Sequence, residues 1–228
     1  MTGTVEDQKR DAANAAVEGY VSSGMTVGLG TGSTAFWVVS RIGELLAAGE
    51  LVDVRGIPTS EATAEQSREL NIPLVELSQA RPDITIDGAD EIDPQLALIK
   101  GRGGALLREK IVASAGDGLI VVADSSKLVD VLGEGTLPVE VEPFGWETTM
   151  AALAALGSDA VLRMEGERPF MTDGGHYTVD CVFDSIPDPD ELETEIKRIP
   201  GALECGLFVK LSRTAVLAHE AGAQIIEA

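Results

Sequence analysis

The chain has 228 residues, 44% of them hydrophobic, which is enough to bury a core in one or two domains. Asp and Glu total 38 against 17 Lys and Arg, and the resulting net charge of −21 disfavours binding to nucleic acid or anionic membranes. No apolar run is long enough for a membrane span, and Met1–Arg10 lacks the apolar core of a signal peptide, so we expect a cytoplasmic protein.

In the first part of the chain, short apolar runs alternate with helical patterns. The predicted strands are Met25–Leu29, Val52–Ile57, Leu74–Leu77, Asp83–Ile86 and Leu119–Ala123. The predicted helices are Ala35–Ala47, Ser60–Leu70 and Ala105–Ala115. This alternation predicts a parallel sheet covered by helices on both faces, as in a Rossmann-like domain.

The pattern changes after about Gly133. The predicted strands are then Leu137–Val141, Ala160–Met164, Tyr177–Phe183 and Gly206–Val209, and the predicted helices are Trp146–Leu156 and Asp190–Arg198. The order strand, helix, strand, strand, helix, strand is typical of a small ferredoxin-like α+β domain. The predicted fold class is therefore α/β. A Rossmann-like domain covers residues 1–133 and 209–228, to which the last segment returns, and a smaller α+β domain covers residues 134–208.

A glycine-rich turn, Gly28-Leu29-Gly30-Thr31-Gly32-Ser33-Thr34, joins the first predicted strand to the first predicted helix. Glycines let the backbone approach an anion, and a helix N-terminus offers N–H groups and a positive dipole end. The turn is neither a dinucleotide fingerprint, since Ser33 takes the place of the third glycine, nor a Walker A loop, since no Lys follows. It indicates a phosphate site or, alternatively, an ordinary capped turn.

Carboxylates cluster in Asp87-Gly88-Ala89-Asp90-Glu91-Ile92-Asp93, directly after a predicted strand. Open α/β sheets bind ligands at the carboxyl ends of their strands. These acids could move the protons of sugar hydroxyls or bind a metal, although the spacing does not fit a calcium loop. A plain turn is the alternative.

A second glycine loop, Lys100-Gly101-Arg102-Gly103-Gly104, leads into the helix predicted to begin at Ala105. Glu109 would lie about one turn into that helix, near the loop. The alternative for Glu109 is a solvated charged face shared with Arg108 and Lys110.

The segment Asp124-Ser125-Ser126-Lys127 again follows a predicted strand, so Lys127 could reach a phosphate or could lie in an exposed loop. The chain has only six lysines, and three of them, Lys100, Lys110 and Lys127, fall in this short stretch. Because lysine is otherwise scarce, this concentration indicates that the protein needs a positive electrostatic potential here to bind an anion.

Metal and histidine chemistry find little support. Cys181 and Cys205 are far apart in sequence and form no C-x-x-C pair, and His176 and His219 lie beside none of the motifs. We therefore expect no metal site and no disulfide. Diffuse acidity with scarce lysine favours a protein adapted to high salt, and a merely acidic cytosolic protein is the alternative.

Taken together and in this order, the four motifs resemble the ribose-5-phosphate isomerase type A family. The resemblance runs from about Tyr20 to Phe144 and includes the stretch Leu137–Gly145. It implies the interconversion of ribose 5-phosphate and ribulose 5-phosphate through an enediolate, with no cofactor. It also implies a sugar phosphate as the small-molecule partner and a homodimer or homotetramer.

The resemblance also implies roles for individual residues. Glu109 matches the general base, Lys100 the active-site lysine, and Asp87 and Asp90 the active-site aspartates. The substrate and phosphate contacts fall on Thr31, Gly32, Ser33, Thr34, Lys100, Gly101, Arg102, Gly103 and Lys127. A further basic residue falls on Lys9 or Arg10. Arg102 departs from the family, in which glycine is often expected at this position.

The chemistry of such an isomerase suits these residue types, because it needs one carboxylate base and positive or N–H groups for the oxyanion. Rival hypotheses are a sugar-phosphate deaminase, a coenzyme A transferase and a sugar-phosphate sensor without turnover.

Overall fold

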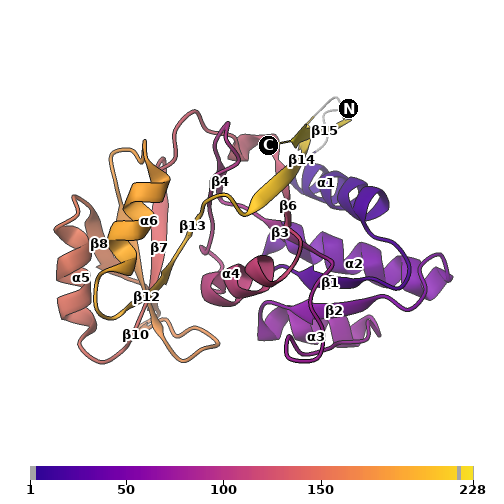
Figure 1. Cartoon of the computed structure of the whole chain (residues 1–228), viewed down its shortest axis with the longest axis horizontal. Coiled ribbons are helices and arrows are strands. Elements are labelled where there is room, and N and C mark those ends of the chain that lie inside the picture. The colour runs from indigo at the N-terminus through magenta and orange to yellow at the C-terminus, as the bar shows by residue number, and fades with distance from the viewer. Residues whose placement is uncertain (1–3, 220–221, 228) are drawn as a thin grey trace. The chain divides into compact units, whose positions relative to one another are not determined.

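The computed structural model describes residues 4–219 and 222–227, which group into two compact units (Figure 1). The first unit comprises Met1–Ala89, Arg108–Lys127 and Lys210–Ala228, and the second comprises Asp90–Leu107 and Leu128–Val209. Residues 1–3, 220–221 and 228, which the sequence assigns to the first domain, lie outside the described residues.

The first unit is built on a six-stranded sheet with the order β15-β14-β6-β3-β1-β2. Its strands are β1 (Thr26–Leu29), β2 (Arg55–Pro58), β3 (Ile84–Gly88), β6 (Leu119–Asp124), β14 (Ser212–His219) and β15 (Gly222–Glu227). Every neighbouring pair is parallel except β14 and β15. This sheet confirms the predicted α/β class and brings the carboxyl ends of β1, β3 and β6 to one edge.

Helices α1 (Val5–Tyr20) and α2 (Ser33–Ala48) pack on one another, α1 also against β6 and β14 and α2 against β3 (Figure 1). The sequence reasoning missed α1. Its N-cap is Thr4, whose side chain accepts a hydrogen bond from the Asp7 N–H while the Asp7 side chain accepts one from the Thr4 N–H. Its buried side is mainly alanine, Ala12, Ala13 and Ala16, so its apolar periodicity is weak.

Helices α3 (Glu61–Glu69) and α4 (Leu106–Ala115) complete the unit. A side chain at Gly28 of β1 would bring its Cβ to 2.8 Å from Val112 of α4. Glycine is therefore required where this helix crosses the strand. The predicted strand Leu74–Leu77 is reduced to one isolated bridge between Leu74 and Gly56.

The second unit contains a four-stranded antiparallel sheet with the order β12-β7-β11-β8. Its elements are β7 (Thr136–Val141), α5 (Trp146–Ala154), β8 (Asp159–Leu162), β11 (Tyr177–Val182), α6 (Pro189–Lys197) and β12 (Ala202–Cys205). The order strand, helix, strand, strand, helix, strand agrees with the prediction for a ferredoxin-like domain, but the last strand of the sheet is β12, whereas the predicted strand Gly206–Val209 overlaps β13 (Leu207–Phe208) of another sheet.

Several small elements lie outside the two main sheets. Strands β4 (Glu91–Ile92), β5 (Leu98–Ile99) and β13 (Leu207–Phe208) form a three-stranded sheet, β9 (Met164–Glu165) pairs with β10 (Arg168–Pro169), and η1 (Ser125–Lys127) is a 3₁₀ turn. The sequence placed residues 90–107 and 128–133 in the first domain, whereas their contacts group them with the second unit. The reason is long-range pairing, since β5 pairs with β13 and Leu132 packs in the second core.

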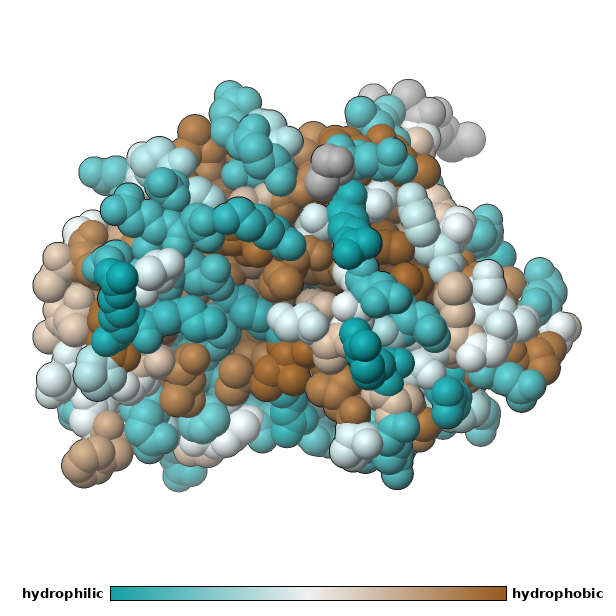
Figure 2. All heavy atoms as spheres, viewed as in Figure 1, coloured by the Kyte–Doolittle hydropathy of each residue, from teal (hydrophilic) through white to brown (hydrophobic). Residues whose placement is uncertain are grey.

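Hydrophilic residues, in teal in Figure 2, are spread over the visible face and are interspersed with hydrophobic residues, in brown. Within residues 4–219 and 222–227, no helix combines the length and the apolar character needed to cross a bilayer.

Candidate active site

The glycine turn after β1 meets the end of β3 within the first unit. Asp87 is buried, with 1% of its surface exposed, and its Oδ1 accepts hydrogen bonds from the Thr31 N–H at 3.1 Å and the Gly88 N–H at 2.7 Å. A Cβ at Gly30 would overlap the Asp87 carboxylate. The missing side chain at Gly30 is thus what brings the turn and the aspartate together.

A cluster of hydroxyl groups forms hydrogen bonds with Thr31 and so stabilises the glycine-rich turn. Thr31 Oγ1 lies 2.7 Å from Thr59 Oγ1, 2.8 Å from Ser60 Oγ and 3.2 Å from Thr63 Oγ1. Thr63 also donates to the Gly30 carbonyl at 2.9 Å. Sequence reasoning missed this cluster, although Ser60, the N-cap of α3, was a recognisable polar start to that helix.

The basic residue beside the turn is Lys9. Its ammonium lies 2.9 Å from Ser33 Oγ and 3.3 Å from Glu6 Oε2. A hydrogen bond from the Trp37 indole, followed by the Lys9 contact, lowers the pKa of Glu6. Arg10 pairs instead with Asp7 at 2.8 Å. Of the two candidates from the sequence, Lys9 is therefore the one whose side chain reaches the turn.

The end of β6 carries Lys127. Asp124 Oδ1 accepts hydrogen bonds from the N–H and the hydroxyl of Ser126, which form the turn η1 that Lys127 ends. Since β6 pairs with β3, this turn and Asp87 share the carboxyl edge of the sheet. Lys127 is half-buried there.

Glu109 lies in the first turn of α4 and is 3% exposed. Its neighbour Lys110 is 6% exposed, whereas the Arg108 side chain is 39% exposed and pairs with Glu61 at 3.0 Å. A solvated charged face, the alternative interpretation of Glu109, does not fit this burial.

The Lys100–Gly104 loop belongs to the second unit. Lys100 is 3% exposed, its N–H donates to the Gly206 carbonyl at 2.9 Å, and its ammonium lies 5.4 Å from the centroid of the Phe208 ring. Gly101 and Gly104 have φ values of 102° and 81°, which disfavour any residue with a side chain.

Arg102, at a position where the resemblance led us to expect glycine, directs its side chain to Glu91. Its Nη2 lies 2.9 Å from Glu91 Oε1, and its N–H donates to Asp90 Oδ2 at 3.0 Å. Glu91 is 3% exposed and also accepts hydrogen bonds from the N–H groups of Gly133 at 2.7 Å, Glu134 at 3.2 Å and Gly135 at 2.7 Å. Sequence reasoning counted Glu91 only as one acid of a cluster, whereas it ties together two loops.

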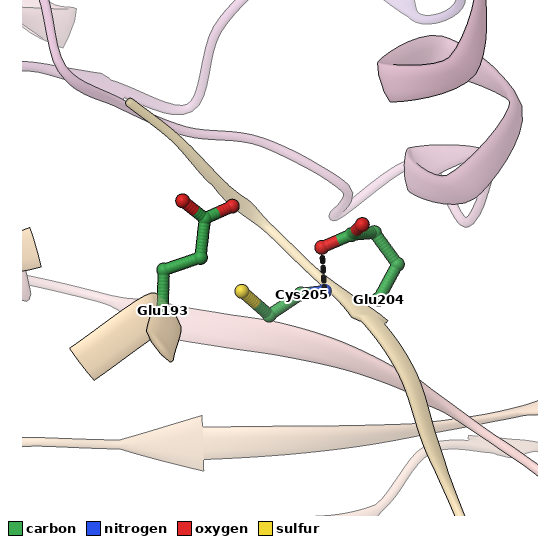
Figure 3. Close-up of side chains that lie close together, drawn as sticks. All are labelled: Glu193, Glu204 and Cys205. Carbon is green, nitrogen blue, oxygen red and sulfur yellow. Dashed lines mark hydrogen bonds between the residues drawn. The ribbon is translucent and has the colours of Figure 1, made fainter. Parts of the chain in front are cut away.

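Among the described residues, one group of three side chains has ligand atoms within 4.8 Å of one another, namely Glu193, Glu204 and Cys205 (Figure 3). Glu204 Oε2 already accepts a hydrogen bond from the Lys197 ammonium at 2.8 Å, and Oε1 from the Cys205 N–H at 3.0 Å. The bond to Glu204 raises the pKa of Lys197, which holds it charged. A metal ion would have to displace this ammonium, so the donor set fits an ion pair better than a metal site.

Comparison with known proteins assigns the family. The sequence model described as ribose 5-phosphate isomerase A (phosphoriboisomerase A) matches residues 55–222. Ribose-5-phosphate isomerase A of Gloeobacter violaceus is 52% identical over 221 residues, which cover 96% of this chain and 95% of that protein.

Solved structures agree over nearly the whole chain. A D-ribose-5-phosphate isomerase in complex with phospho-erythronic acid has a TM-score of 0.96 at 37% identity, covering 99% of this chain and 100% of the other. Ribose 5-phosphate isomerase from Plasmodium falciparum has a TM-score of 0.94 at 43% identity, covering 98% and 99%. The chain is therefore an enzyme, an aldose–ketose isomerase, and belongs to the ribose 5-phosphate isomerase A family.

Proposed function

We propose that this family member interconverts ribose 5-phosphate and ribulose 5-phosphate through an enediolate, with Glu109 as the general base. The observation that carries the proposal is a carboxylate 3% exposed in the first turn of a helix that directly follows a glycine loop. Burial holds the carboxylate in one position, where the same group can take a proton from one carbon of the substrate and deliver a proton to the other.

In the forward direction, Glu109 removes the proton from C2 of the open-chain aldose. The C–H electron pair forms the C1–C2 double bond, and the C1 carbonyl oxygen becomes the enediolate oxyanion. The proton of the C2 hydroxyl then passes to O1, and the carboxyl of Glu109 protonates C1, which gives the ketose. The same steps in reverse regenerate the aldose.

The oxyanion requires positive charge or N–H donors, which we assign to Lys100 and to the Gly101–Gly104 backbone. Opening of the furanose ring needs a carboxylate that moves a hydroxyl proton, and we assign this step to Asp87 or Asp90. The Arg102 side chain points to Glu91, so we assign only the backbone of Arg102 to substrate binding.

For the phosphate we propose Ser33, Thr34, Lys9 and Lys127, where the N-terminus of α2 adds backbone N–H groups and the Gly32 backbone gives close access. Thr31 then supports the turn through its hydroxyl partners. The phospho-erythronic acid bound to the structural neighbour carries both a phosphate and a carboxylate, which suits one phosphate site and one oxyanion site.

Replacement of Glu109 by Gln tests the base, because it keeps the shape and removes the proton acceptor. We expect kcat to fall by about 10²–10⁴-fold with KM within about threefold of the starting value. Deuterium incorporation from D₂O into the sugar, followed by NMR, should fall in parallel. Glu69→Gln, an exposed acid at the end of α3, is the matched control. Near-normal kcat in Glu109→Gln would transfer the base to Asp87 or Asp90.

Four finer properties belong to the same proposal. The side chains above supply both base and electrophile, so we propose that activity needs no metal or organic cofactor and survives chelation. Two buried cysteines that are not joined in a disulfide, Cys181 and Cys205, support a reducing, cytoplasmic location. Phe144 is 90% exposed in the single chain, which supports a homodimer or homotetramer in which a partner subunit covers this side chain. Light scattering would test the oligomeric state. The net charge of −21 supports adaptation to high salt.

A further inference from the structure

We propose that Arg163, in the second unit, is a positioning residue that sets the orientation of the Gly101–Gly104 backbone. The inference rests on the proposed function of that loop as the oxyanion site. Arg163 lies between β8 and β9, and its side chain is 15% exposed. It lies outside the motifs that the sequence analysis singled out.

The guanidinium is itself held rigidly. Its Nε donates to Asp180 Oδ2 at 2.9 Å and its Nη2 to Asp180 Oδ1 at 2.5 Å, a two-bond pairing that fixes the plane of the group. The ring of Phe170 packs against it, with the guanidinium carbon 5.6 Å from the ring centroid. A fixed guanidinium can impose its geometry on whatever its remaining N–H groups contact.

What those groups contact is the catalytic loop. Nη1 lies 3.1 Å from the Gly101 carbonyl and 3.1 Å from the Arg102 carbonyl. A trans peptide points its N–H opposite to its carbonyl. The N–H groups of Arg102 and Gly103 therefore point away from Arg163, and the Arg102 N–H donates to Asp90 Oδ2. Arg163 and Asp90 thus clamp one peptide from its two sides.

Arg163 also affects the position of Gly104, at the end of the loop, because Phe170 packs against both residues. A Cβ at Gly104 would overlap the Phe170 ring, so the loop backbone lies directly against the residue that packs on Arg163. Gly104 in turn donates its N–H to the Gly101 carbonyl at 3.0 Å, the same oxygen that Arg163 contacts. One guanidinium therefore fixes two carbonyls directly and the closing glycine indirectly.

Lysine at this position tests the idea, because one ammonium keeps the charge but cannot pair with Asp180 and contact both carbonyls in this geometry. We expect Arg163→Lys to lower kcat by about 10–100-fold with KM changed less than about threefold, since a misplaced donor costs catalysis rather than phosphate binding. Arg168→Lys, an exposed arginine on β10, is the control and should be unchanged. Full kcat in a folded Arg163→Lys would overturn the proposal.

Chemical rescue separates positioning from stability. In Arg163→Ala, guanidinium ion at low, non-denaturing concentration should restore kcat at least about threefold, while ammonium and urea should not. Arg168→Ala with the same additive controls for general binding of the cation to an acidic surface. Equal effects on both variants would count against the assignment.

Amide hydrogen exchange measures the order of the loop backbone independently of catalytic activity. We expect faster exchange in peptides covering residues 99–106 in Arg163→Lys, with residues 26–34 of the first unit unchanged. Faster exchange without loss of kcat would overturn the positioning role, because the loop would then lose its order at no cost to turnover, and it would also contradict the oxyanion site assigned to the loop. Unchanged exchange would refute the clamp itself, whatever the identity of the base.

Discussion

Replacement of Glu91 by Gln should destabilise the second unit far more than a single buried hydrogen bond would suggest. The carboxylate accepts four hydrogen bonds, two at each oxygen, from the N–H groups of residues 133–135 and from Arg102. An amide has only one acceptor atom. Whichever way the Gln side chain turns, its NH₂ group faces two donors.

The loss in the free energy of unfolding follows from the two N–H donors that would face the NH₂ group instead of an acceptor. A buried donor that loses its acceptor costs about 1–3 kcal/mol, so two such donors cost about 2–6 kcal/mol. We expect about 4 kcal/mol. For a chain of this size, 1 kcal/mol lowers Tm by about 2–4 °C, which gives a decrease of about 8–16 °C.

The assay is thermal and urea unfolding followed by circular dichroism. Glu134→Gln, an exposed acid in the same loop, is the matched control and should shift Tm by less than about 2 °C. Arg102→Gly should cost less than Glu91→Gln, because the three backbone donors keep their acceptor. If the Tm of Glu91→Gln equals that of Glu134→Gln, the reasoning is refuted.

Three further outcomes concern Lys9, the net charge and the buried thiol of Cys181. Lys9→Ala should raise KM about 10–100-fold, the value of a charge-assisted hydrogen bond, while Arg10→Ala should leave KM unchanged in the same coupled assay. Tm should rise with KCl from 0.1 M to above about 1 M, as the screening length falls from about 10 Å to about 3 Å, and a flat or falling Tm would contradict adaptation to salt. Burial raises the pKa of the Cys181 thiol from 9.0 to about 11. The free energy of unfolding therefore keeps its full value below pH 9.0 and falls by about 3 kcal/mol as the pH rises to 11, because the unfolded chain loses this proton more easily than the folded one. In a plot of stability against pH, Cys181→Ala should remove this decrease.

The sequence was informative where the chemistry is local. Glycines and hydroxyls after an apolar run predicted the turn beside Asp87, because strand end, turn and helix start are contiguous in the chain. The second unit was predictable for the same reason, since strand and helix periods changed in a recognisable order.

Features carried by distant pairs were not predictable. Arg163 is 17 residues from Asp180 and 62 from Gly101, so no spacing rule connects them. The assignment of residues 90–107 likewise depends on two-residue strands, of which β5 pairs with Leu207 and Phe208 and β4 pairs with β5. Helix α1 was missed for a different reason, because an alanine face gives little hydrophobic contrast.

The chain passes between the two units four times, and this has a consequence for synthesis on the ribosome. The second unit is complete once residue 209 has been made, whereas the first still lacks β14, which pairs with β6 in the interior of its sheet. The unit that begins first in the sequence is therefore the last to close. Until residues 212–219 emerge, one side of β6 offers unpaired backbone groups to any other strand. The interval between these two events is the stage at which the nascent chain is most exposed to misassembly.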